Sequence, residues 1–457
     1  MPNINESANR HGAGRFRVGW MVALLASTAL VAVPSALSPL GTGGAALAGG
    51  GVGGTSSFNG GGTAGATNST GAGSPGGNGT TYSGGGGGGG VGANGGAGGA
   101  PSNSNGNNAG SCSGGSSGGG SVSSGGGGSG GAGATGTGSA GGDGGDGPST
   151  GGGGGGGGGA NGYVGTSAPT GAVAGGAGGN GGAGVANGTN YGAGGGGGAG
   201  GYGAVFTGSG SYTIQYDIIG GAGGKGGSGS SKTSDNNPGH GGDGGYGLLL
   251  TQSGAAITVN DGVTVMGGKG GAADRHSGNV DNSGAGALGI SGTSFTLTLA
   301  PTATVAGGSG LGGIAHAIHF DGGNSTLELK GNGLTKVNSY ATIGGLVIAF
   351  GTSNTFKISG LGGYFDLTKV DGDKNSTLAT FGGFDKIEVA PDASSTWIVD
   401  GAQGTFGTGN WKVTQGTLQL GSWLDSATLN GGVDVLAGST LAVFAAKTST
   451  VSGAMSI

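Results

Sequence analysis

The chain between residues 49 and about 200 consists almost entirely of Gly, Ser, Ala, Asn and Thr, and Asp143 and Asp146 are its only charged residues. Such a stretch has little apolar surface to bury, and glycine loses more conformational entropy on folding than any other residue. We therefore expect a loose, partly disordered Gly/Ser-rich region over residues 49–200. The alternative is that stacked glycine-rich turns extend the structure of the region that follows.

Charge and cysteine content exclude two further classes of protein. Only 8% of the residues are charged, the net charge is -5, and Arg275 is the only arginine after Arg17. No basic face is available to neutralise phosphates, so we expect no nucleic-acid partner. Cys112 is the only cysteine, so a disulfide framework cannot hold the chain together.

The N-terminal segment, 1–48, has the pattern of a signal peptide. An apolar run over 20–33 is interrupted by Pro34 and follows three arginines: Arg10, Arg15 and Arg17. Ala46 and Ala48 are small residues at the spacing that signal peptidase requires, which places the cleavage before Gly49. We predict that this segment directs export to the cell surface, the outer membrane or the extracellular medium. The alternative is a buried N-terminal helix.

The apolar run of the signal peptide is too short and too broken to remain as a membrane span. No later stretch approaches the ~20 apolar residues that a spanning helix needs. We therefore predict that the mature chain contains no transmembrane helix.

A long internal repeat begins after residue 200. The segment GYGAVFTGSGSYTIQYDIIGGAGGKGG from Gly201 resembles GYGLLLTQSGAAITVNDGVTVMGGKGG from Gly245. The alignment pairs Ile214 with Ile257, Tyr216 with Val259, and Lys225 with Lys269. A looser third copy starts near Gly284 and places Leu297 and Leu299 at the positions that Ile257 and Val259 have in the second copy.

Each copy contains a short segment in which β-branched or aromatic residues alternate with polar ones, at 212–216, 256–259 and 295–299. This alternation indicates β-strands. A strand of three to five residues cannot bury its apolar face alone, but stacked copies form a continuous core. We predict an all-β solenoid over 201–313, in which one copy makes two rungs of about twenty residues and the glycine-rich part loops out.

Residues 314–457 continue the strand spacing with larger and more charged side chains. Asp-Gly, Gly-Gly, Asn-Gly and Ala-Gly turns separate the apolar segments. The predicted strands lie at 317–320, 326–329, 343–350, 355–358, 386–389, 396–399, 411–413, 417–420, 433–436 and 441–444. We interpret this part as further solenoid rungs.

Residues 200–457 resemble the passenger region of autotransporters, the self-secreting outer-membrane proteins of Gram-negative bacteria. The resemblance rests on GGxGG blocks alternating with short strands, and on AHAIHFDGGNSTLEL at 315–329. It also rests on WKVTQGTLQLGS at 411–422, which is similar to the autotransporter-associated strand repeat, and on GVDVLAGSTLAVF at 432–444. These motifs occur in the order that such passengers have.

The resemblance implies a right-handed parallel β-helix displayed outside the cell, commonly an adhesin or a structural stalk, with a glycan or protein of a host or cell surface as its ligand. It also implies an outer-membrane translocator barrel as a partner, which is absent from this chain. Because 441–451 still has the pattern of a passenger rung, we favour a chain truncated before the barrel. The alternative is secretion through another protein.

Few side chains of this sequence could take part in a reaction or bind a metal. We predict no catalytic, cofactor-binding or metal-binding residue. Asp274, Arg275 and His276 adjoin in a glycine loop, which we interpret as a solvated turn rather than a site for proton transfer. His316 and His319 are three positions apart in an extended segment, an odd spacing that places them on opposite faces and disfavours a shared metal.

Three tryptophans of the predicted mature chain favour packing over a sugar-binding platform. They are Trp397, Trp411 and Trp423. Two other function classes stay open beside the adhesin or stalk: a β-helix carbohydrate-active enzyme, and a glycine-rich surface protein of the PGRS kind, whose blocks resemble GGAGGNGG at 175–182.

Overall fold

The computed structural model describes residues 63–64, 76, 137–147, 152–185, 192–230, 238–273, 283–334, 339–371, 380–404 and 411–457. The chain divides into two compact units, Met1–Thr42 and Gly43–Ile457, and all described residues belong to the second. Several residues singled out in the sequence lie outside the described ranges: the cleavage residues Ala46, Ala48 and Gly49, the single Cys112, and the loop residues Asp274, Arg275 and His276.

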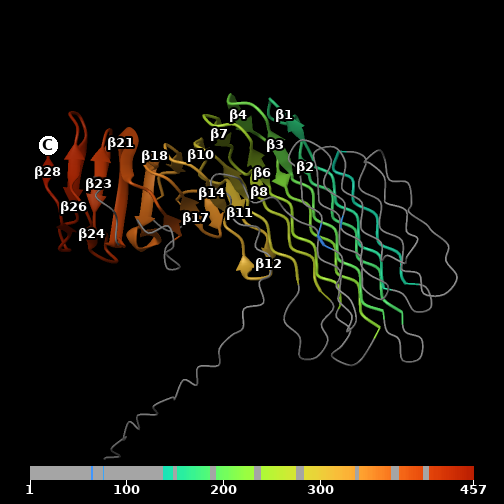
Figure 1. Ribbon diagram of the computed structural model, residues 1–457. Coiled ribbons are helices and arrows are strands. Elements are labelled where there is room, and N and C mark those ends of the chain that lie inside the picture. The colour runs from blue at the N-terminus through green and yellow to red at the C-terminus, as the bar shows by residue number, and fades with distance from the viewer. Residues whose placement is uncertain are drawn as a thin grey trace, which may run out of the picture. The chain divides into compact units, whose positions relative to one another are not determined.

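The described part of the chain is all-β and consists mainly of stacked parallel sheets (Figure 1). The largest sheet has thirteen strands. Its main path is β28 (Met455–Ser456), β25 (Val433–Val435), β22 (Trp411–Val413), β21 (Lys386–Ala402), β18 (Thr355–Asp366), β15 (Thr326–Gly331), β10 (Thr296–Leu299), β7 (Ala256–Val259) and β4 (Ser211–Ile214). Beside this path lie β23 (Thr417–Leu420), β24 (Ala427–Leu429), β26 (Thr440–Val443) and β27 (Thr450–Val451).

Two smaller parallel sheets accompany the thirteen-stranded sheet. The eight-stranded sheet has the order β1 (Val164–Gly165), β3 (Ala204–Phe206), β6 (Leu248–Leu250), β9 (Ile290–Gly292), β14 (Ile318–Phe320), β17 (Val347–Ala349), β20 (Phe381–Gly382) and β19 (Val370–Asp371). The five-stranded sheet has the order β16 (Thr342–Gly344), β11 (Thr304–Ala306), β8 (Thr264–Met266), β5 (Ile218–Ile219) and β2 (Val173–Ala174).

Other elements are short. The strands β12 (Ser309–Gly310) and β13 (Gly313–Ile314) form an antiparallel pair. A 3-10 turn, Leu367–Lys369, is the only helical element in the described ranges. Among the described residues, no helix has the length and apolar character needed to cross a membrane.

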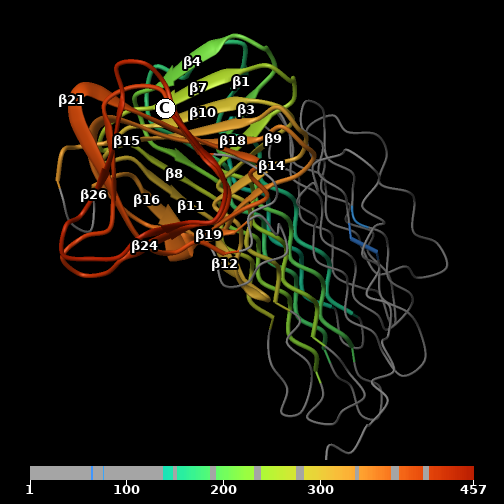
Figure 2. The ribbon, with the colours of Figure 1, turned by 90° about the vertical axis from the view of Figure 1, so that its left-hand side faces the viewer.

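From β3 to β18, apart from the β12–β13 pair, the chain visits the three parallel sheets in turn, and the strands of each sheet pair in register from one coil to the next. An inward column of buried residues results from this register. It consists of Tyr212, Ile257, Leu297, Leu327, Phe356, Ile387, Trp411 and Val433. Because alternate residues of a strand face opposite sides, this column packs inside the coils while its polar neighbours face outward. Figure 2 shows the coils with the C-terminal strands β21, β24 and β26 toward the viewer.

The register between the first two copies of the repeat differs from the sequence alignment. Tyr212 pairs with Ile257 and Ile214 pairs with Val259, so Ile214 is not opposite Ile257. Tyr216, which the alignment placed opposite Val259, is 42% exposed and lies beyond the strand. A slip of two positions preserves the inward and outward alternation, so the pattern alone could not distinguish the two registers. The predicted match of Leu297 with Ile257 and of Leu299 with Val259 is confirmed.

The prediction of two rungs per copy is wrong, because each copy makes a single coil. Ile257 pairs directly with Leu297, its counterpart in the next copy, and no strand intervenes between them in that sheet. The later coils are shorter. The paired residues Leu297 and Leu327 are closer in sequence than Ile257 and Leu297. Trp411 and Val433, which pair near the C-terminus, are closer still. The additional residues of the early coils lie in glycine-rich segments that extend out of the coil and return, as the sequence predicted for this part.

These glycine segments form an ordered, hydrogen-bonded array, which appears in Figure 1 as extended ribbons without arrows. The N–H groups of Gly195, Gly198 and Gly201 donate to the carbonyls of Gly182, Gly179 and Gly176, so these two segments run antiparallel. The N–H groups of Gly197 and Gly200 donate to the carbonyls of His240 and Asp243 in a parallel segment. Donors recur at every third position, which is the period of a polyproline II helix.

Glycine is required because the segments lie so close together. A Cβ atom on Gly198 would overlap the carbonyl oxygen of Gly157, and one on Gly179 would overlap that of Gly142. The same overlap with a backbone carbonyl recurs three positions to either side of Gly198, at Gly195 and Gly201. The hydrogen bonds and close backbone packing take the place of a side-chain core.

The favoured prediction of a loose chain over residues 49–200 is wrong for the described ranges 137–147, 152–185 and 192–200. There, the N–H groups of Gly141 and Gly144 donate to Ala177 and Asn180, and those of Gly156 and Gly159 donate to Gly196 and Ala199. The alternative, in which glycine-rich segments extend the following structure, describes these ranges. Backbone hydrogen bonds provide the stabilisation that apolar burial cannot supply here.

Most predicted strands of residues 314–457 are confirmed, including 326–329 within β15 and 417–420 as β23. The segment predicted over 343–350 is two strands, β16 and β17, because Gly345 has a φ of +130° and turns the chain between the sheets. Two strands are longer than expected. β18 continues through an irregularity between Gly360 and Gly362, and β21 continues through the facing residues between Pro391 and Thr396. Beyond it, Gly363 pairs with Trp397.

Candidate binding site

The outward face of the thirteen-stranded sheet has a column of polar side chains, held in register from coil to coil. Its members are Thr298, Glu328, Lys357, Glu388, Lys412, Asp434 and Ser456. Lys357 Nζ lies 3.6 Å from both Glu328 Oε1 and Glu388 Oε1. Thr298 Oγ1 donates to Glu328 Oε2 at 3.0 Å. Opposite charges therefore alternate along this column and partly neutralise one another.

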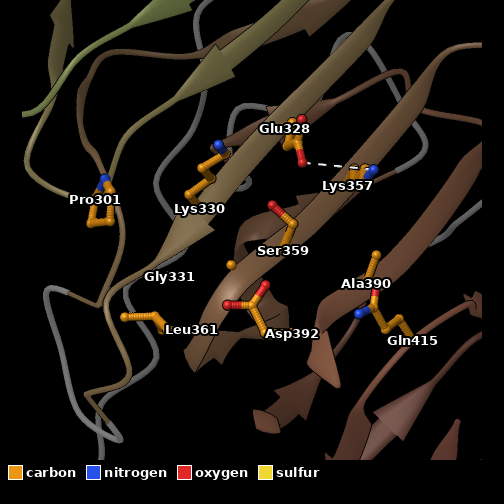
Figure 3. A pocket seen from close by; sticks show the side chains of 11 residues that line it. Pro301, Glu328, Lys330, Gly331, Lys357, Ser359, Leu361, Ala390, Asp392 and Gln415 are labelled. Atoms are coloured by element: carbon orange, nitrogen blue, oxygen red, sulfur yellow. Dashed lines mark ion pairs between the residues drawn. The ribbon is translucent and has the colours of Figure 1, made fainter. Parts of the chain in front are cut away.

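The sheet surface is depressed beside this column, because two of the next outward positions have short side chains. Lys330 pairs with Ser359, and Ser359 pairs with Ala390. These lie two positions beyond Glu328, Lys357 and Glu388 on the same strands, so their side chains face the same side of the sheet. The short side chains of Ser359 and Ala390 form the floor of a groove of about 470 Å³ (Figure 3).

The walls of the groove come from successive coils. Glu328 and Lys357 line one side of Ser359, and Leu361 and Asp392 line the other. Pro301, from the turn after β10, and Gln415, from the turn between β22 and β23, lie toward its two ends. Leu361 is 59% exposed and so offers apolar surface to a bound molecule.

The irregularity in β18 places the groove at this point on the sheet. Gly360 and Gly362 have φ angles of +74° and +78°, a left-handed conformation that favours glycine. Between them, Leu361 is turned outward to the rim. Behind the groove, Trp397 is fully buried and its Nε1–H donates to the Ser359 carbonyl at 3.0 Å. This hydrogen bond fixes the backbone at the groove floor.

The Ser359 hydroxyl is a buried and unsatisfied polar group at the groove floor. Ser359 is only 5% exposed, and its Oγ atom has no hydrogen-bond partner among the described residues. Buried hydroxyls are usually hydrogen-bonded, since an unpaired one loses its interactions with water without compensation. The groove is lined by hydrogen-bond donors and acceptors and by side chains of both charges. No histidine or cysteine lines it, so it has no histidine base to activate the serine.

His316 and His319 are closer together than the sequence suggests. Their rings stack with centroids 5.7 Å apart. His316 precedes β14, so the alternation of a strand does not separate it from His319, and the prediction of opposite faces is wrong. His319 Nδ1 lies 2.7 Å from Asp321 Oδ1, and Ser291 Oγ donates to Asp321 Oδ2 at 3.0 Å.

The histidine pair does not amount to a metal site in the described part of the chain. No cluster of three or more His, Cys, Asp or Glu side chains suited to a metal ion occurs among the described residues. Burial, and then the charge of His319, lower the pKa of His316 below its ordinary value. The pair is therefore a candidate for pH sensitivity of stability.

The tryptophan prediction is right for two residues and wrong for one. Trp397 and Trp411 are fully buried, and Trp411 Nε1–H donates to Gln403 Oε1 at 3.0 Å. Trp423 is 65% exposed. The groove itself was missed, because its floor depends on which residues of separate strands lie side by side. The short side chains at Ser359 and Ala390 were the only signal available.

Comparison of the chain with protein-family models, curated proteins and solved structures gave no match. The fold and the groove are therefore the basis on which a function can be assigned.

Proposed function

We propose that this protein is an exported, surface-displayed β-solenoid of the autotransporter-passenger type, with a right-handed coil, that acts as an adhesin or cell-surface stalk. The observation that carries the proposal is the column from Thr298 to Ser456, which presents polar side chains in register on successive coils of one sheet. A face of this kind suits binding to another surface more than catalysis, so the proposal assigns no enzymatic activity to the chain.

The glycine array supports a structural component of this role. Its segments are held by hydrogen bonds and close backbone contacts instead of a large apolar core. Solenoids are extended by adding further units of this kind, each of which contacts only its neighbours. An outer-membrane translocator barrel is the partner that the proposal implies for delivery to the surface.

The proposal is tested by expressing the full chain in a Gram-negative host, with an epitope tag after Ile457 and a translocator barrel fused after the tag. We expect N-terminal sequencing of the mature protein to begin at Gly49, and added protease to degrade the tagged chain on intact cells. An A46D/A48D variant should retain the segment 1–48 and stay inside the cell. A wild-type chain that stays in the cytoplasm would overturn the proposal.

A second measurement addresses the fold separately from export. The purified protein should give a far-ultraviolet circular dichroism spectrum dominated by β-structure and the polyproline II contribution of the glycine array. A spectrum dominated by helix would contradict the solenoid regardless of where the protein is found.

A further inference from the structure

The groove around Ser359 has two features of a ligand site. Its floor contains the hydroxyl of a residue that is only 5% exposed, and this hydroxyl has no partner among the described residues. Its volume of about 470 Å³ falls in the range of ligand pockets. A hydroxyl or carbonyl group of a bound molecule would supply the partner that the Ser359 hydroxyl lacks.

The charges lining the groove favour a neutral ligand. Glu328 and Lys357 already form an ion pair, and Lys330 and Asp392 contribute one charge of each sign. Two carboxylates and two ammonium groups leave the lining without net charge. A polyanion or polycation would meet repulsion from one pair of side chains as well as attraction from the other.

The mixture of donors and acceptors suits hydroxyl groups, which both donate and accept. Carboxylates only accept and ammonium groups only donate, while the Gln415 amide and the Ser359 hydroxyl do both. A sugar can therefore satisfy all of these groups at once. Leu361, which is 59% exposed, and Pro301 provide apolar surface for the C–H face of a sugar ring.

The sheet does not offer the alternative of binding a peptide by strand addition. β18 already pairs with β15 on one side and with β21 on the other, so its backbone hydrogen-bonding groups at Thr355–Gly360 are occupied. Peptides that extend a sheet need a free edge. Recognition in the groove must then come from side chains, as it does for carbohydrates.

We infer that the groove over Ser359 and Ala390 binds a neutral carbohydrate chain, aligned across the coils from Pro301 toward Gln415. The inference deepens the proposed surface role, which it requires, by naming its ligand class. Neighbouring strands are spaced ~4.8 Å apart, so a ligand reaching from the turn after β10 to the turn after β22 crosses several coils. This length suits an oligosaccharide better than a single sugar.

Binding of the purified full chain to an array of neutral, sialylated and sulfated oligosaccharides tests this inference, followed by titration calorimetry with the neutral glycans that bind. Ser359→Ala removes the buried hydroxyl and should weaken binding about tenfold, the equivalent of one lost hydrogen bond. Ser359→Leu fills the hollow and should abolish binding. Lys386→Ala, an exposed residue of the same sheet outside the groove, should leave affinity unchanged.

Circular dichroism of each variant establishes that it is folded. Binding confined to acidic glycans, no glycan binding by the folded protein, or undiminished binding by Ser359→Leu would each overturn the inference. Its failure is separable from failure of the proposed function. Surface display without glycan binding refutes only the ligand, whereas glycan binding by a protein that is never exported refutes the surface role.

Discussion

The Oδ1 atom of Asp143 accepts a hydrogen bond of 2.7 Å from the backbone N–H of Asn180, in the next parallel glycine segment. Asn180 Oδ1 in turn accepts from the N–H of Lys225 at 2.9 Å. Asp243 and Asn161 do the same for Ala285 and Tyr202. In these glycine segments, two of every three backbone N–H groups donate to carbonyls of neighbouring segments. An Asp or Asn at the third position of one segment supplies the acceptor for the remaining N–H group of the next segment.

Removal of one such acceptor should loosen the next segment locally. We expect Asn180→Ala to lower the free energy of opening at Lys225 by about 1 kcal/mol, because the Lys225 N–H loses its partner. Amide hydrogen exchange of the Lys225 N–H measures this directly. Asn180→Asp, which keeps an acceptor oxygen at the same position, is the control. Unchanged protection at Lys225 in Asn180→Ala would show that the side chain does not hold the segments together.

The inward glycines should tolerate no side chain. Gly198→Ala would drive a methyl group into the carbonyl oxygen of Gly157, and we expect it to destabilise the array by about 3 kcal/mol, at the upper end for overpacking. Gly171→Ala is the matched control, since nothing lies within 4 Å of a Cβ atom at that position. Hydrogen exchange over 153–203 reports the effect, and equal exchange in the two variants would contradict it.

The sequence was sufficient to predict strands and inward faces, but not their alignment between coils. Leu297 and Leu299 were matched correctly to Ile257 and Val259, whereas Ile214 was placed two positions out of register. Alternation has a period of two, so it cannot detect such a slip. The missing information is the length of each turn, which depends on contacts with the neighbouring coil.

The glycine segments and the groove were harder to predict, for a related physical reason. The glycine-rich composition suggested disorder, because glycine loses much conformational entropy on folding. Hydrogen bonds between segments that are distant in sequence, such as the one from the Gly159 N–H to the Ala199 carbonyl, compensate for this loss, and a local sequence pattern does not reveal them. The groove likewise needs Lys330, Ser359 and Ala390 side by side, and these residues belong to three separate coils. Both features become visible only when the coils are stacked.

A buried carboxylate joins the C-terminal coils. Asp400 is 3% exposed, accepts a 2.6 Å hydrogen bond from the Tyr364 hydroxyl, and also accepts from the Ser422 hydroxyl. Asp400→Ala leaves both hydroxyls without this acceptor, so we expect a loss of about 3 kcal/mol in the free energy of unfolding. Chemical denaturation followed by tryptophan fluorescence measures it. The exposed Asp425→Ala should change stability by less than about 0.5 kcal/mol, and a similar effect of both variants would refute the role of Asp400.

The same contact predicts sensitivity to alkaline pH. Burial, followed by the hydrogen bond to Asp400, raises the pKa of Tyr364 above its ordinary value of 10.0. The folded protein then retains a proton that the unfolded chain releases, so the stabilisation is complete below about pH 10 and is lost as the pH rises above it. Tyr364→Phe should reduce this loss in denaturation curves between about pH 9 and about pH 11, a range that brackets the tyrosine pKa of the unfolded chain. An unaltered pH dependence in Tyr364→Phe would contradict the assignment.

The stacked histidines predict the opposite dependence at mildly acidic pH. Burial and the charge of His319 lower the pKa of His316 below its ordinary value of 6.5, so the unfolded chain takes up a proton more readily than the folded one. Stability should therefore be complete above about pH 6.5 and fall as the pH drops below it. Burial lowers the pKa of His240 as well, so a His240→Gln and His316→Gln double variant should lose less stability on acidification than either single variant. Thermal unfolding at a series of pH values measures this, with Lys386→Gln as a variant that should keep the wild-type slope. If His316→Gln alone retains the full acid sensitivity, the stacked pair is not its source.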